Sequence, residues 1–249
     1  MDKVKILILA GGLGKRMNNL QLPKVLVELN GKPLIKHLLE AIKVSGVDSR
    51  PSIVVGKKAE LVKATLGDEY DYVFQAEQLG TGHAVMCAEE ALAGRAENIL
   101  VLYGDMPLLL PQTIKNFAAS HLASGKELTM GTVLVDEFSD WRTGFYDFGR
   151  IIRNSADAVC GIVEKKDATP EQLAIKEVNP GYFCFKAAWL WGSLKKLKNE
   201  NNQREYYLTD LVQIACEQGI EINTVLISPK EAVGINNEDQ LKVAEKLMG

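Results

Sequence analysis

The chain has 249 residues, of which 47% are hydrophobic and 24% charged, and its formal net charge is −3 at pH 7. These values are ordinary for a soluble globular protein of one large or two small domains. The weak net charge gives no general attraction to nucleic acid or to acidic membranes, so we expect neither as a partner. Any anion-binding site should therefore be a local feature. No apolar run approaches the roughly 18 residues of a membrane span, and no signal peptide precedes the first apolar run, which predicts a cytoplasmic protein. No protein partner is identifiable.

The chain begins with an apolar run, 4–9, that predicts a strand buried on both faces, as in a parallel sheet. The run stops at a glycine-rich stretch followed by three cations: Ala10, Gly11, Gly12, Leu13, Gly14, Lys15, Arg16 and, after Pro23, Lys24. Glycines allow a backbone to approach a ligand closely, and successive N–H groups can form a nest for anionic oxygens. This stretch predicts a phosphate-binding loop; a glycine turn with solvated lysines is the alternative.

Two better-known phosphate loops are excluded by spacing. A Walker loop requires Ser or Thr after Gly-Lys, and Gly14-Lys15 is followed by Arg16. The dinucleotide fingerprint requires a third glycine where this chain has Met17. A redox enzyme that binds a dinucleotide is therefore disfavoured.

Strand-like and helix-like segments alternate over the first 110 residues. Helices are expected at 34–42, 59–66 and 81–93, and strands at 53–55, 72–74 and 99–102. Such alternation predicts an α/β fold with a mostly parallel central sheet and helices on both faces. Because ligands collect beyond the carboxyl ends of parallel strands, the glycine loop, Gln75 and Asp105 should share one edge.

The second half is less regular. Helices are expected at 114–122, around 208–216 with Thr209 as cap, and at 237–248; strands at 128–135, 149–152, 159–164, 181–186 and 222–227; and an aromatic-rich loop at 137–150. The simplest organisation is one domain, 1–249, with lobes of about 1–110 and 111–235 and a C-terminal helix at 236–249. The cysteines are far apart in apolar contexts, which predicts reduced core residues: Cys87, Cys160, Cys184 and Cys216.

Several polar residues are candidates for chemistry. Asp105 follows a buried strand, where a carboxylate can hold Mg²⁺ or simply cap a turn. The stretch 75–84, QAEQLGTGHA, offers the amide of Gln75, the backbone of Gly80 and the hydroxyl of Thr81, which suit hydrogen bonding to a base and a sugar; alternatively it only starts a helix. His83 is expected to pack or cap.

Other candidates have weaker local signals. Glu164 could accept hydrogen bonds from sugar hydroxyls or be a solvated strand end, and Asn179 and Asn236 read locally as turn residues. No Ser-His-Asp or Cys-His arrangement stands out, which disfavours covalent hydrolase chemistry.

Together these motifs resemble the uridyltransferase domain of N-acetylglucosamine-1-phosphate uridyltransferases, among the sugar-nucleotide pyrophosphorylases. The shared motifs cover nearly the whole chain in order: LAGGLGKRM (9–17), LPK (22–24), QAEQLGTGHA (75–84), LYGDMP (102–107), GRI (149–151), GIVEKKDA (161–168), NPG (179–181), EYYLTD (205–210) and GINN (234–237). The loop motif is shared by many nucleotidyltransferases, whereas QAEQLGTGHA and GIVEKKDA indicate the uridyl, N-acetylhexosamine branch.

The resemblance implies a Rossmann-like nucleotidyltransferase fold with a nucleotide-binding half and a smaller sugar-binding lobe. It implies catalytic roles for Arg16, Lys24 and Asp105, and Mg²⁺ ligands at Asp105 and Asn236. The nucleotide would be bound by Leu9, Ala10, Gly11, Gly12, Lys24, Gln75, Gly80 and Thr81. The sugar would be bound by Tyr103, Gly104, Gly149, Glu164 and Asn179.

The implied reaction joins UTP and N-acetylglucosamine 1-phosphate into UDP-N-acetylglucosamine and pyrophosphate, with Mg²⁺ as cofactor. A sugar phosphate is already mostly ionised because its second pKa is about 6, so no general base is required. The same chemistry on glucose 1-phosphate, N-acetylgalactosamine 1-phosphate or a thymidine nucleotide is the first alternative. A non-catalytic sugar-nucleotide sensor is the second.

The chain departs from the family pattern in four places. Gly11 stands where the family often has alanine, Arg204 stands where it often has glycine, and the loop 141–148 is longer and more aromatic than usual. Many members continue into a left-handed β-helix acetyltransferase domain, whereas this chain stops at Gly249. We therefore expect no acetyltransferase activity and no trimerisation through that domain.

Overall fold

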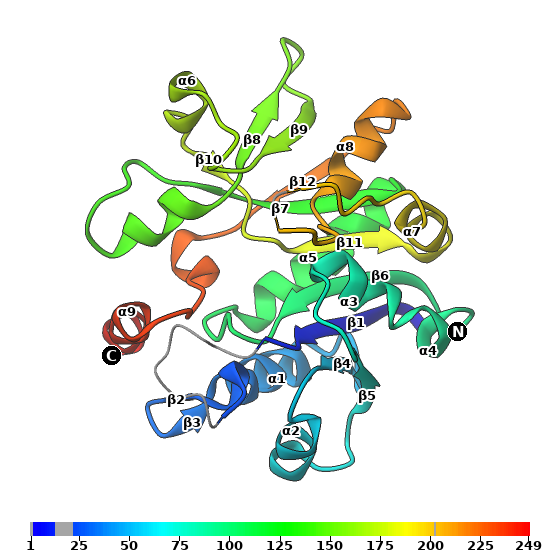
Figure 1. Ribbon diagram of the computed structural model, residues 1–249, viewed down its shortest axis with the longest axis vertical. Helices are drawn as coiled ribbons and strands as arrows, with labels where there is room; N and C mark the ends of the chain where they lie inside the picture. The colour runs from blue at the N-terminus through cyan, green and yellow to red at the C-terminus, as the bar shows by residue number, and fades with distance from the viewer. Residues whose placement is uncertain (1, 13–21, 202) are drawn as a thin grey trace.

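The computed structural model describes residues 2–12, 22–201 and 203–249, and a ten-stranded sheet runs through these parts of the chain (Figure 1). Its strand order is β5-β4-β1-β6-β11-β7-β10-β8-β9, with β12 paired to β7. Four neighbouring strands are mutually parallel: β5 (Asp71–Phe74), β4 (Ser52–Val55), β1 (Asp2–Ala10) and β6 (Ala96–Tyr103). The predicted α/β fold with a parallel core is confirmed.

The second half of the chain extends this sheet mainly by antiparallel pairing. The added strands are β11 (Phe183–Lys186), β7 (Leu128–Leu134), β10 (Glu177–Val178), β8 (Arg150–Arg153), β9 (Val159–Val163) and β12 (Asn223–Leu226), of which β12 runs parallel to β7. A separate hairpin joins β2 (Glu28–Leu29) to β3 (Lys32–Pro33). The division into two lobes stays a prediction.

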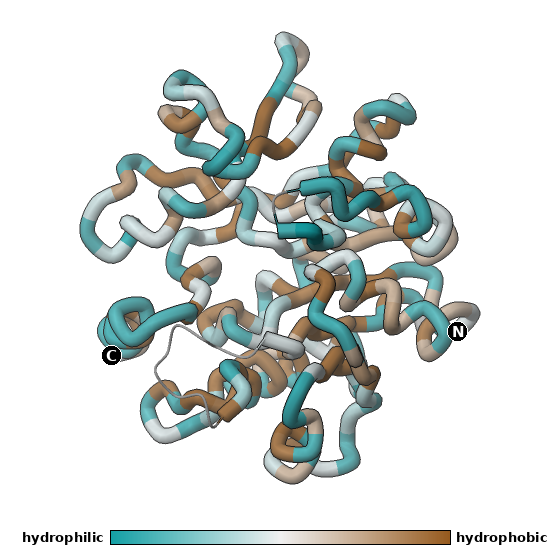
Figure 2. The backbone as a smooth tube through the Cα atoms, viewed as in Figure 1, coloured by the Kyte–Doolittle hydropathy of each residue, from teal (hydrophilic) through white to brown (hydrophobic). Residues whose placement is uncertain are grey.

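Helices cover both faces of the sheet, as alternation along β1 requires. Ile6 and Ile8 pack on one face with α1 (Leu34–Ser45), α2 (Ala59–Leu66) and α5 (Pro111–Ser124). Leu7 and Leu9 pack on the other with α3 (Thr81–Met86), α4 (Glu89–Leu92), α7 (Ala187–Leu194) and α8 (Asp210–Glu217). Figure 2 shows the C-terminal helix α9 (Glu238–Met248) as mainly hydrophilic, and Ala244 is its one fully buried residue in the core.

Four local expectations need correction. The helix expected at 81–93 is divided into α3 and α4, because the N–H of Ala88 donates to the carbonyl of Val85 and tightens the turn between them. The expected loop at 137–150 contains a 3₁₀ helix, η2 (Asp140–Asp147). Cys160 is exposed, since it takes the outward position in β9, and Thr209 precedes α8 without a side-chain cap bond.

The remaining short helices connect these elements. They are η1 (Lys24–Leu26), α6 (Pro170–Leu173) and η3 (Pro229–Ala232). None of the helices in the described ranges is both long and apolar enough to cross a membrane.

A buried histidine beneath the sheet makes stability depend on pH. His121 of α5 contacts Thr129 Oγ1 at 2.8 Å and Asn98 Oδ1 at 3.0 Å, and burial, with Lys186 nearby, lowers its pKa to about 4. The unfolded chain takes up this proton below about pH 6.5, whereas the folded protein resists it until about pH 4, so stability falls through that window. The loss in the free energy of unfolding should approach about 3 kcal/mol.

His121→Gln should therefore show a smaller decline in the free energy of unfolding between pH 7 and 4, measured by chemical denaturation. The same decline in the variant and the wild-type protein would contradict this role of His121.

Candidate active site

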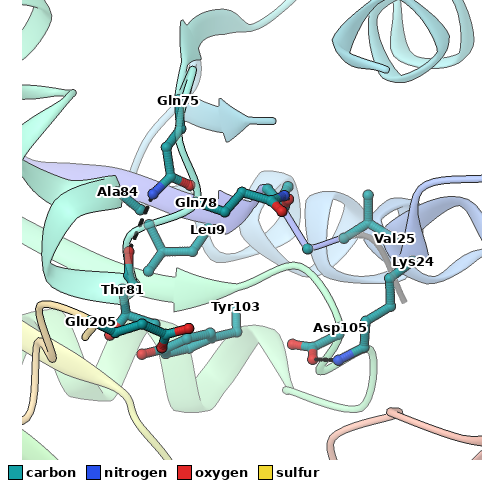
Figure 3. Close-up of a pocket in the computed structure, with 14 residues that line it drawn as sticks. Leu9, Lys24, Val25, Gln75, Gln78, Thr81, Ala84, Tyr103, Asp105 and Glu205 are labelled. Carbon is teal, nitrogen blue, oxygen red and sulfur yellow. Dashed lines mark hydrogen bonds and ion pairs between the residues drawn. The ribbon is translucent and has the colours of Figure 1, made fainter. Parts of the chain in front are cut away.

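A cavity of about 280 Å³ lies beyond the carboxyl ends of β1, β5 and β6 (Figure 3). All eight residues predicted for the nucleotide line it, together with Tyr103, predicted for the sugar, and Asp105, predicted for the metal: Leu9, Ala10, Gly11, Gly12, Lys24, Gln75, Gly80 and Thr81. They come from segments up to 96 positions apart, since Leu9 and Asp105 face one cavity. The parallel sheet gathers them because the carboxyl ends of its strands share an edge.

The glycine-rich segment is described only at its two ends. Leu13–Met17, with the predicted catalytic residue Arg16, lie outside the described residues. At the described ends, the N–H of Lys24 donates to the carbonyl of Gly12 at 3.3 Å. Gly12 and Lys24 therefore lie side by side at the cavity.

The side chain of Lys24 connects Asp105 and Asn236, the two residues predicted to bind the metal. Its ammonium donates to Asp105 Oδ2 and, at 2.5 Å, to Asn236 Oδ1 (Figure 3 shows the pair with Asp105). Asn236 reaches this place because the chain returns from β12 towards the first half, where the N–H of Ile235 donates to the carbonyl of Asp105 at 3.0 Å. The local reading of Asn236 as a turn residue missed this long-range contact.

The chemistry of this pair fits a divalent cation. A carboxylate and an amide oxygen are hard ligands, and one ammonium already bridges them. Within the described ranges no group of three His, Cys, Asp or Glu side chains is placed to hold a metal ion. The pair thus suits a metal that takes one or two protein oxygens and completes its coordination with phosphates and water, as Mg²⁺ commonly does.

Gln75 is buried and oriented by its neighbours. Its Nε2 lies 3.2 Å from the carbonyl of Gly80, to which it donates, and 3.1 Å from His83 Nδ1. A Cβ on Gly11 would lie 2.9 Å from Gln75 Oε1. An alanine at Gly11 would thus require the amide of Gln75 to shift, whereas glycine leaves it in place.

Gly80 and the following turn are docked against the segment 205–208. Gly80 has φ of +104°, and a Cβ there would lie 2.5 Å from the carbonyl oxygen of Tyr206. The N–H of Tyr206 donates to Leu79 and the carbonyl of Tyr206 accepts from Gly82, at 2.7 and 2.8 Å. The Thr81 hydroxyl accepts from the N–H of Leu208 at 3.1 Å, so Thr81 also has a structural role.

Gly80→Ala should weaken nucleotide binding more than it lowers turnover. The new methyl group must push 205–208 away, because the obstacle is backbone, and the positive φ disfavours alanine. We expect a KM for the nucleotide raised about tenfold or more, equivalent to about 1.4 kcal/mol. Gly94→Ala is the control for a left-handed glycine, since its φ is +75° and no atom lies within 4 Å of its Cβ position. Equal effects in both variants would contradict the docking argument.

The residues predicted for the sugar form a second group, outside the cavity except for Tyr103. Asn179 Oδ1 accepts from the N–H of Gly181 and its N–H donates to Gly149, both at 2.9 Å. A Cβ on Gly149 would lie 2.6 Å from Ile162 Cγ2 and 3.3 Å from Glu164 Oε1, so glycine lets Glu164 approach.

Tyr103 lies between the two groups. A Cβ on Gly181 would lie 2.8 Å from Tyr103 Cε2, so the ring lies over this glycine, whose φ is +89°. Burial raises the pKa of Tyr103, and the charges of Asp105 and Glu164 raise it further. Gly104 packs tightly in the turn after β6, with its Cβ position 2.9 Å from Val25 Cγ1.

Sequence reasoning predicted Glu164 but missed Gln78, Glu205 and Asp210 in this region. Burial raises the pKa of Glu164, as does the nearby Asp210, while the Thr209 hydroxyl hydrogen-bonds Glu164 instead of capping α8. Burial also raises the pKa of Asp210. Gln78 donates to the carbonyl of Gly11, and Glu205 lines the cavity. Gln78 lies in the motif QAEQLGTGHA, and Glu205, Thr209 and Asp210 lie in EYYLTD, but neither motif indicated which side chains face the site.

The aromatic loop packs around a buried arginine. The Arg150 guanidinium lies 4.7 Å from the ring centroid of Phe138 and 5.1 Å from that of Tyr146, and it donates to the carbonyls of Tyr146 and Phe148. Such cation–π contacts tie the loop to β8, next to Gly149.

Arg204 stands where the family often has glycine. Its φ is 54°, which is the left-handed conformation that glycine adopts most easily.

Lys24, the two oxygen groups that it contacts and a buried amide gather at one edge of a parallel sheet, an arrangement that suits nucleotide binding in an α/β protein. Residues 6–207 match the family of MobA-like NTP transferase domains. The chain belongs to this family, and the nucleotidyltransferase relationship predicted from the motifs is confirmed.

Relatives support the same assignment. The chain is 42% identical over 243 residues to the bifunctional protein GlmU of Clostridium beijerinckii, covering 97% of this chain and 51% of that protein. It is 41% identical over 248 residues to GlmU of Caldanaerobacter subterraneus, covering 100% and 52%. The chain thus spans about half the length of these curated relatives.

A solved structure shares the fold. It is a putative glucose-1-phosphate thymidylyltransferase from Bacillus anthracis in complex with sucrose, with a TM-score of 0.77 and 20% identity. The match covers 98% of this chain and 94% of that one.

Proposed function

We propose that this chain transfers UMP from UTP to N-acetylglucosamine 1-phosphate, giving UDP-N-acetylglucosamine and pyrophosphate. The observation that carries the proposal is the convergence of Lys24, Asp105 and Asn236 at the same sheet edge as Gly12 and Gln75. The identity to GlmU proteins over nearly the whole chain supports the uridyl branch. The motifs QAEQLGTGHA and GIVEKKDA support it further.

In this proposal the sugar phosphate attacks the α-phosphorus of UTP in line, opposite the leaving pyrophosphate. The nucleophile is already ionised near pH 7, so the protein must mainly position two anions and neutralise their repulsion. Lys24 supplies a cation at the cavity, and the glycine-rich motif would supply N–H groups. Mg²⁺, held by Asp105 and Asn236, would stabilise the charge that develops on the phosphate oxygens.

The remaining residues would bind and select the substrates. Gln75 and Gly80 are assigned to uracil, and Thr81 to the product near its sugar. Glu164, Gly149 and Asn179 are assigned to the sugar, reached past Tyr103. The division into a nucleotide half of about 1–110 and a sugar half of about 111–235, and a cytoplasmic location, belong to the same proposal.

The test is pyrophosphate release from UTP and Mg²⁺ with a panel of sugar 1-phosphates, with and without chelator. Chelator-sensitive release that is fastest with N-acetylglucosamine 1-phosphate would support the whole proposal. Release with glucose or N-acetylgalactosamine 1-phosphate instead would keep the reaction and change the substrate. No release with any sugar, together with tight binding of UDP-sugars, would indicate a sensor and refute the enzyme.

A further inference from the structure

Helix α9 holds the backbone of Asn236 through one side chain. Gln240 lies in the first turn of α9, and its Oε1 accepts from the N–H of Asn236 at 2.6 Å. The cap itself is made by Asn237, whose Oδ1 accepts from the N–H of Gln240 at 2.9 Å. In an ordinary capping box the side chain of this third helical residue returns to the capping residue's own N–H. Gln240 reaches one residue further back, to Asn236.

The bond from Gln240 acts on Asn236, whose side chain already points to Lys24. Asn236 Oδ1 accepts from Lys24 at 2.5 Å, and the preceding N–H, from Ile235, donates to the carbonyl of Asp105. Gln240 accepts the next N–H along the chain, that of Asn236, which lies between Ile235 and the start of α9. The direction of the Asn236 side chain depends on this backbone, which is pinned on one side by Asp105 and on the other by Gln240.

Gln240 lies close to the aromatic loop. A Cβ on Gly144 of η2 would lie 3.4 Å from Gln240 Nε2, and both residues line a cavity of about 380 Å³ between η2 and α9.

We propose that Gln240 is a positioning residue that fixes Asn236 as a ligand of the divalent cation. This inference rests on the proposed function, because it takes Asp105 and Asn236 as the cation ligands. Groups that orient metal ligands from behind commonly change metal affinity 10- to 100-fold when they are removed. Gln240→Ala should therefore weaken cation binding about tenfold, with little change in the binding of the uridine nucleotide.

The experiment compares two variants with the wild-type protein: Gln240→Ala and Asn237→Ala. Mn²⁺ is titrated against each protein saturated with UDP-N-acetylglucosamine, and the free ion is counted by electron paramagnetic resonance. Thermal unfolding of each variant is measured in parallel. Asn237→Ala is the matched control, because it removes the helix cap and destabilises α9 while leaving the contact between Gln240 and Asn236.

The expected result is weaker Mn²⁺ binding in Gln240→Ala and near-wild-type binding in Asn237→Ala despite its lower Tm. Equal weakening in Gln240→Ala and Asn237→Ala would overturn the proposal, since loosening of the helix end would explain both. Unchanged binding in Gln240→Ala would also overturn it. Wild-type protein that binds Mn²⁺ but releases no pyrophosphate would refute the transferase reaction and leave the positioning role standing; wild-type protein that binds no Mn²⁺ would refute both.

Discussion

Lys24→Met is expected to have opposite effects on catalysis and on metal binding. The variant should lose about 10²- to 10³-fold in kcat/KM, the usual loss when one preorganised donor to a developing charge is removed. The same change should tighten Mn²⁺ binding by the nucleotide-free protein, because the ammonium that bridges Asp105 and Asn236 is gone. Steady-state kinetics and a Mn²⁺ titration of the free protein measure the two effects.

The opposite directions separate this prediction from simple damage to the fold. Lys43→Met is the matched control, because Lys43 is exposed on α1, and it should change neither measurement. Weaker Mn²⁺ binding in Lys24→Met would show that Lys24 supports the cation site and does not compete for it. A kcat/KM close to wild type would remove Lys24 from the catalytic residues.

Asp105→Asn should reduce turnover at least about 10³-fold. The substitution keeps the shape of the side chain but removes the negative charge that pairs with Lys24 and would pair with the cation. A neutral amide binds Mg²⁺ much more weakly than a carboxylate, so raising the Mg²⁺ concentration should restore little activity. Pyrophosphate release over a range of Mg²⁺ concentrations measures this loss.

Stability must be followed in the same variant, because Asp105 also forms an ion pair. The backbone link from Ile235 to the Asp105 carbonyl does not involve the substituted side chain, so Tm should change by only a few degrees. Asp68→Asn, at an exposed position after α2, is the control for loss of one negative charge. Near-wild-type turnover of Asp105→Asn at saturating Mg²⁺ would remove Asp105 from the cation site.

Sequence periodicity was sufficient for the parallel half of the fold. The apolar run of β1, buried on both faces, and the alternation up to Tyr103 predicted the parallel core and the edge where Gln75 and Asp105 meet. Periodicity was less successful for the aromatic-rich segment 137–150, whose side chains pack on the guanidinium of Arg150. The 3₁₀ helix η2 forms around Arg150, whose aromatic and carbonyl partners come from the same loop.

The motifs also determined which residues to consider for the site, while their mutual arrangement depended on long-range contacts. By local chemistry Asn236 was a turn residue, and the resemblance alone suggested a ligand. Its contact with Lys24 spans 212 positions, and its support by Gln240 depends on how α9 begins.

The sequence by itself determined the family, the parallel core and the chemical types of the site residues, because those depend on local pattern and short motifs. Only the tertiary structure decided that Lys24 bridges Asp105 and Asn236 and that Glu164 lies near Asp210. Contacts between distant segments depend on how strands and helices pack, and residue spacing along the chain does not specify that packing.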